Sequence, residues 1–145
     1  MTTRAMYTVR IIVGILAGAA GLLALAALWH GAGLVTQPVS PSYAYTEYFT
    51  HCVSWSFTAA YFALNMLLGL LLRRNWPIAL GMIIPLAVAL LIEMRRDPTG
   101  HNLFPFEIIM VWMPVFGVAW LAASLGEMLV TRRSRPPVIQ SGPPR

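Results

Sequence analysis

The sequence has no lysine, a single cysteine and only five acidic residues. Because Cys52 is the one cysteine, a disulfide within the chain is excluded. The short motifs HExxH, GxSxG, CxxC, GxGxxG and the Walker loop are all missing, which excludes the enzyme classes that such motifs reveal. Charged residues make up 10% of the chain, whereas soluble domains contain about 25%. This shortage of charge argues against a soluble protein.

Apolar residues dominate what is present: they make up 58% of the 145 residues and gather in four runs. As a helix, which rises 1.5 Å per residue, each run would approach the roughly 30 Å thickness of a bilayer core. We expect spans at about residues 11–29, 51–72, 77–94 and 105–130. The predicted fold class is all-α, an integral-membrane four-helix bundle within residues 1–133. The proline-rich residues 134–145 are expected to be a disordered tail.

The lengths of the runs and of their connections refine this layout. The first run exceeds the roughly 7–15 apolar residues of a signal peptide, so we interpret it as a retained anchor. Only residues 73–76 separate the second run from the third, which predicts that helices two and three form a tight hairpin. Residues 31–50 form one long connection rich in proline, serine and tyrosine.

The arginines are distributed unequally between the two ends of the predicted helices. Four spans place the N-terminus, the connection at 73–76 and the tail on one side, and leave only Arg95 and Arg96 on the other. The first side carries eight arginines: Arg4, Arg10, Arg73, Arg74, Arg132, Arg133, Arg135 and Arg145. Because basic residues favour the cytoplasmic side, both termini and the tail are predicted to be cytoplasmic. All three histidines and four of the five acids then lie at the outer face.

The outer connection EMRRDPTGHNLFPFE, residues 93–107, holds three of the five acids. Much of it suits a plain connector: Asp-Pro-Thr-Gly at 97–100 matches a type I turn, and Asn102 suits the N-cap of helix four. Glu93 and Arg96, three residues apart, can form an ion pair on helix three. His101 is required by none of these roles, which leaves a binding role open.

Two kinds of site remain open in this connection. In the first, the two arginines bind an anionic group and polar neighbours orient it by hydrogen bonds. The residues of this ligand-binding site would be Arg95, Arg96, Asp97, His101, Asn102 and Glu107. In the second, His101 and Glu107 hold a divalent metal together with His51. Apart from that metal, no cofactor is predicted.

Residues 96–107, RDPTGHNLFPFE, resemble an RDPTxHNLxPFE-like signature of a family of small, uncharacterised bacterial inner-membrane proteins. The resemblance includes the hydrophobic layout but not the connection at 31–50 or the tail. It implies a multi-pass protein of a bacterial inner membrane and points to Asp97, His101, Asn102, Pro105 and Glu107. It implies no activity and no cofactor.

The first run also carries small residues at spacings of three and four: Gly14, Gly18 and Gly21. Small residues on one face let another helix approach closely, so these glycines predict a packing surface. The helix that packs there could belong to the same chain or to a second copy.

These observations favour a function in binding rather than catalysis. We expect a small multi-pass membrane protein that contacts a partner, a lipid headgroup or an anionic ligand through its outer face. The expected partners are membrane lipid and, alternatively, another membrane protein or a second copy, but not nucleic acid. The alternative is a membrane enzyme or metal-binding protein that uses residues 93–107. A small-solute transporter ranks third because the membrane middle lacks an ionisable relay.

Overall fold

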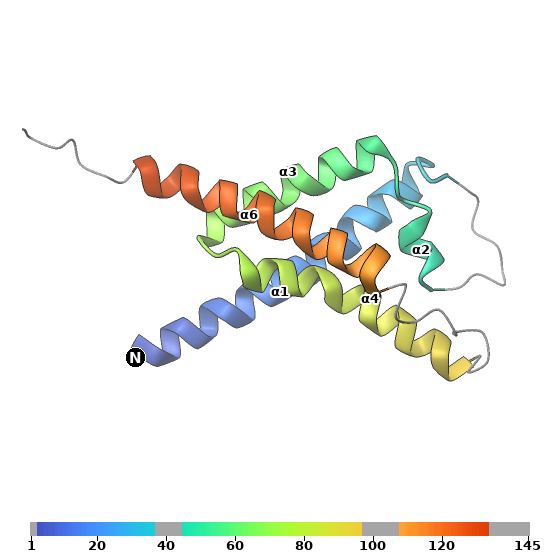
Figure 1. Cartoon of the computed structure of the whole chain (residues 1–145), viewed down its shortest axis with the longest axis horizontal. Coiled ribbons are helices and arrows are strands. Elements are labelled where there is room, and N and C mark those ends of the chain that lie inside the picture. Colours follow the sequence, from blue (N-terminus) through green and yellow to red (C-terminus); the bar gives the residue numbers. More distant parts are fainter. Residues whose placement is uncertain (1–2, 37–44, 97–107, 134–145) are drawn as a thin grey trace, which may run out of the picture.

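The computed structural model describes residues 3–36, 45–96 and 108–133, and every regular element in these ranges is a helix (Figure 1). The elements are α1 (Thr3–Gly31), α2 (Glu47–Thr50), α3 (Trp55–Leu72), α4 (Trp76–Arg96), the π-helical turn η1 (Ile108–Trp112) and α6 (Met113–Arg133). Within the described ranges, α1, α3, α4 and η1–α6 are long and apolar enough to cross a membrane. The prediction of an all-α chain with four such helices is confirmed for this part of the protein.

Local capping decides where α3 begins and ends. Ser54 has an extended backbone, and its Oγ accepts a hydrogen bond from the Phe57 N–H at 3.2 Å, so the helix starts at Trp55 rather than at residue 51. At the other end Arg73 adopts a left-handed conformation with φ of 52°, which stops the helix. The expected long connection before α3 contains the short helix α2, which the sequence did not predict.

The long helices pack mainly as two pairs, α1 with α4 and α3 with α6, and α4 also contacts α6 (Figure 1). Glycine permits both close approaches. A Cβ added to Gly81 would lie 2.1 Å from the Ile15 carbonyl oxygen, and one added to Gly126 would lie 2.1 Å from that of Met66. Although only residues 73–75 join α3 to α4, these two helices diverge from the connection and contact each other little.

The glycines predicted as a packing surface on α1 face the interior of the molecule. A Cβ on Gly14 would lie 2.9 Å from the Cβ of Pro77, and one on Gly18 would lie 2.3 Å from the Ile78 carbonyl oxygen. Gly21 faces a leucine side chain of α3. The structure therefore places α4 of the same chain, rather than a second copy, against Gly14 and Gly18.

The buried residues of α3 include two with polar side chains, Tyr61 and Asn65. The Tyr61 hydroxyl donates to the Val115 carbonyl oxygen of α6 at 3.0 Å, and Asn65 Nδ2 donates to the Tyr61 carbonyl oxygen at 2.8 Å. Outward faces carry large apolar side chains, such as Leu16 and Leu71, each 63% exposed. Hydrocarbon suits such a surface better than water does.

Candidate functional site

Both described arginines of the outer connection lie at the C-terminal end of α4, where the helix dipole favours positive charge. Arg95 and Arg96 are exposed there, at the end of the molecule that also carries α2, which we call the α2 end (Figure 1). The other predicted ligand-binding residues, Asp97, His101, Asn102 and Glu107, lie outside the described residues.

A cavity of about 760 Å³ lies beside Arg96, between α1, α4 and the segment that contains α2. We call it the α1–α4 groove. Ala19 and Leu23 of α1 form one side. The α4 side is a stripe of residues that share one helical face because they recur at spacings of about four: Ile84, Pro85, Val88, Ala89, Ile92 and Arg96. Arg96 lines the groove and Arg95, about 100° further round the helix, does not.

Aromatic side chains from the segment around α2 cover the groove near Arg96. They are Tyr45, Tyr48 and Phe49. The Arg96 guanidinium carbon lies 4.9 Å from the centroid of the Tyr45 ring, which is a cation–π contact. The groove thus has a long apolar part and, at one end, a cation beside an aromatic ring.

Glu93 of α4 binds Thr46, which lies next to Tyr45 in the segment around α2. Its carboxylate is buried, with the residue 6% exposed, and it accepts a hydrogen bond from the Thr46 backbone N–H. The Thr46 hydroxyl lies 2.8 Å and 3.0 Å from its two oxygens. The ion pair between Glu93 and Arg96 suggested by their spacing does not form. Instead, the Glu93 carboxylate accepts hydrogen bonds from Thr46, and the Arg96 guanidinium contacts the Tyr45 ring.

A second contact ties α1 to the same segment. The His30 ring stacks on Tyr48 with centroids 4.0 Å apart, and His30 Nε2 lies 2.8 Å from the Tyr48 carbonyl oxygen. A carbonyl oxygen only accepts, so Nε2 carries the proton. The Cys52 thiol donates to the same oxygen at 3.4 Å. Burial raises the pKa of Cys52, and burial together with the neighbouring Cys52 raises the pKa of Tyr48, so both groups stay neutral at physiological pH.

The structure describes one of the three predicted metal ligands. His51 is half-buried at the C-cap of α2, and its carbonyl oxygen accepts hydrogen bonds from the Thr36 N–H at 2.9 Å and the Thr36 hydroxyl at 3.0 Å. His101 and Glu107 lie outside the described ranges. Within those ranges no three His, Cys, Asp or Glu side chains gather closely enough to hold a metal.

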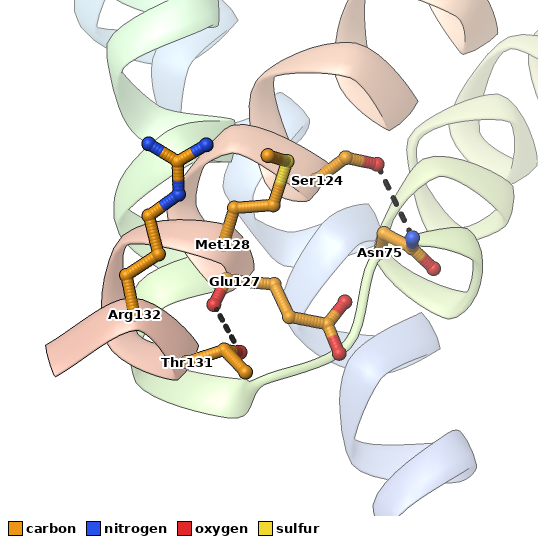
Figure 2. A pocket seen from close by; sticks show the side chains of 6 residues that line it. All are labelled: Asn75, Ser124, Glu127, Met128, Thr131 and Arg132. Carbon is orange, nitrogen blue, oxygen red and sulfur yellow. Dashed lines mark hydrogen bonds between the residues drawn. The ribbon is translucent and has the colours of Figure 1, made fainter. Parts of the chain in front are cut away.

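A second pocket of about 540 Å³, lined mostly by residues with polar or charged side chains, lies at the opposite end of the molecule, between α6 and the connection that joins α3 to α4 (Figure 2). Its lining residues are Asn75, Ser124, Glu127, Met128, Thr131 and Arg132. This pocket was not predicted from the sequence. The available signal was Glu127, a carboxylate inside an otherwise apolar run, because ionisable residues in membrane helices usually have a function.

Comparison with protein-family models found no match to this chain, and neither curated proteins nor solved structures gave one.

Proposed function

We propose that this chain is a small multi-pass protein of a bacterial inner (plasma) membrane with both termini in the cytoplasm. Three observations support the proposal: the apolar outward faces of four long helices, the eight arginines against two, and the resemblance of residues 96–107 to an inner-membrane family. The α2 end would then face out of the cell.

Its function, we further propose, is to bind an anionic lipid in the α1–α4 groove. The observation that carries this proposal is the position of Arg96 at one end of a groove that is otherwise mostly apolar. A phosphate headgroup would lie against Arg96, and an acyl chain would lie along Val88, Ile84 and Leu23.

The surroundings of Arg96 leave it able to bind such a headgroup. The contact with the Tyr45 ring gives the Arg96 N–H groups no oxygen acceptor, whereas a phosphate would supply several. The nearest carboxylate along α4, that of Glu93, is already bound by Thr46 and does not neutralise the arginine. Among the described residues, therefore, no carboxylate of α4 neutralises the positive charge of Arg96.

The adjacent arginines provide a matched test. Purified protein is mixed with equal amounts of phosphatidylglycerol and phosphatidylcholine that have the same acyl chains, and bound lipid is measured by native mass spectrometry. We expect Arg96→Ala to lower the preference for the anionic lipid about tenfold, because a charged hydrogen bond is lost. Arg95→Ala removes the same charge from the same helix end and should change the preference less than about twofold.

A second variant tests the apolar part of the groove. Val88→Trp places a large ring among the α4 residues that line it and should displace the lipid while Arg96 remains. Equal effects of Arg95→Ala and Arg96→Ala, together with no effect of Val88→Trp, would show that the lipid binds by general surface charge and would overturn the proposal.

A further inference from the structure

The pocket at the end opposite α2 contains a carboxylate with no partner among the described residues. Glu127 is half-buried, and its side chain makes neither a hydrogen bond nor an ion pair there. Figure 2 shows the carboxylate directed toward the connection that carries Asn75, whereas the Arg132 guanidinium points away from it. The guanidinium of Arg74, in the same connection as Asn75, contacts the Tyr7 ring, with its carbon 4.8 Å from the ring centroid.

The other polar groups around Glu127 have mostly used their donors. The Ser124 hydroxyl donates to the Trp120 carbonyl oxygen at 2.7 Å, and the Thr131 hydroxyl donates to the Glu127 carbonyl oxygen at 2.8 Å. Asn75 donates from Nδ2 to Ser124 Oγ at 3.2 Å, and its Oδ1 accepts the Trp76 N–H at 2.6 Å.

The remaining capacity of these groups is mainly that of acceptors. Both hydroxyl oxygens and the Asn75 amide oxygen keep a free lone pair, and the Glu127 carboxylate keeps all of its own. Such a set is complementary to a group with several N–H donors and a positive charge, which describes a primary ammonium. Arg132 lines the same pocket, and its guanidinium is complementary to an anion attached to the ammonium.

We propose that this pocket binds a primary ammonium that is linked to a phosphate. The ammonium would donate to Glu127 and to the Ser124 and Thr131 oxygens, and the phosphate would lie toward Arg132. The ethanolamine headgroup of a phospholipid has this chemistry, and so does free phosphoethanolamine. The position of the pocket near the last turns of a membrane-length helix places it where headgroups lie, which favours the lipid as the source.

The test compares lipids that differ only at the nitrogen. Full-length protein in mild detergent is mixed with equal amounts of phosphatidylethanolamine and phosphatidylcholine, and bound lipid is measured by native mass spectrometry. We expect about a tenfold preference for phosphatidylethanolamine, because the trimethylammonium of phosphatidylcholine has no N–H to donate. Equal binding of the two lipids by the wild-type protein would overturn the proposal without any variant.

Variants then locate the preference. Glu127→Gln should abolish it, whereas Glu47→Gln, which removes an exposed carboxylate at the α2 end, should leave it unchanged. If the preference survives Glu127→Gln, the pocket is not its origin and the proposal is wrong. Arg96→Ala should also leave it unchanged, so this test and that of the α1–α4 groove can fail separately.

A competition with free phosphoethanolamine distinguishes the two sources. If the soluble compound displaces phosphatidylethanolamine only at a large excess, the membrane lipid is the ligand. If it binds as tightly as the lipid, the ammonium site stands and its ligand is a soluble phosphate ester of an amino alcohol.

Discussion

Single residues hold the α2 segment on the rest of the protein, and among the described residues Glu93 is the buried acidic one. A buried carboxylate is costly unless hydrogen bonds replace its water, and Thr46 supplies them from its N–H and its hydroxyl. Glu93→Ala leaves these donors unpaired and should lower the free energy of unfolding by about 2 kcal/mol. Glu93→Gln keeps an acceptor oxygen and should cost less.

Unfolding of these variants in mixed detergent micelles, followed by circular dichroism, measures the difference. Glu47→Gln is the control, because Glu47 is exposed and the effect of a surface substitution should stay within about 0.5 kcal/mol. A Glu93→Ala protein as stable as the wild type would show that Thr46 finds other acceptors and that the carboxylate does not hold the segment.

The reactivity of the Cys52 thiol gives a second prediction for a single residue. Because the chain has no other cysteine, the measurement reports on Cys52 alone. Cys52 is fully buried and its pKa is raised, so little of the reactive thiolate is present at pH 7–8. We expect iodoacetamide to modify the folded protein at least about tenfold more slowly than the same chain unfolded in SDS. Equal rates in the two states would show that the segment around α2 opens freely.

The raised pKa of Cys52 also fixes the sign of a pH dependence. Well below the usual thiol pKa of about 8.5, the thiol is protonated in both the folded and the unfolded chain, and its contribution to stability is fully present. As the pH rises further, the unfolded thiol loses its proton first, so the free energy of unfolding falls until the folded thiol also ionises. Cys52→Ala should reduce this loss of stability at alkaline pH, as measured by unfolding at pH 7 and pH 10.

At the scale of helices, glycines allow the paired helices to approach closely. Two glycines with different surroundings allow a matched prediction. Gly81→Ala puts a methyl group 2.1 Å from the Ile15 carbonyl oxygen and should destabilise the protein by about 1–3 kcal/mol. Gly117→Ala, in α6, meets nothing within 4 Å and should be neutral or stabilise by up to about 1 kcal/mol. Unfolding in mixed micelles compares them, and equal effects would contradict the observed pairing of α1 with α4.

The sequence predicted the four long helices well because their signal is local. Apolar composition over some twenty residues and arginines beyond it are visible in any one segment. Helix partners are not visible in this way. Gly18 indicates a close approach, but only the three-dimensional structure shows that Gly81, rather than a glycine of another helix, lies near it.

The candidate site was predicted less completely, for a related reason. Arg96 was identified from the sequence, and so was its capacity for an anion. What distinguishes Arg96 from Arg95 is that Arg96 lines the groove. Tyr45 and Phe49, from a distant part of the sequence, line the same groove. A four-residue helix such as α2 carries too few residues for a periodic pattern.

At the scale of the whole molecule, the arrangement predicts which parts are accessible from each side of the membrane. In a Cys52→Ala background, Leu34→Cys, an exposed position at the α2 end, should react with a membrane-impermeant maleimide in spheroplasts. A cysteine added after Arg145 should react only after lysis if the arginine-rich side is cytoplasmic, as we propose. The reverse pattern would invert the topology and would place the α1–α4 groove on the cytoplasmic side.

The pairing of α1 with α4 and of α3 with α6 has a consequence for biosynthesis. Neither α1 nor α3 has its main partner when it leaves the ribosome, because each partner lies a helix or more further along the chain. At about 5–20 residues per second, α1 waits several seconds in the translocon or in lipid before α4 emerges. A nascent chain arrested just after α3 should therefore hold two helices without their main partners, and it would be the stage most exposed to quality-control proteases.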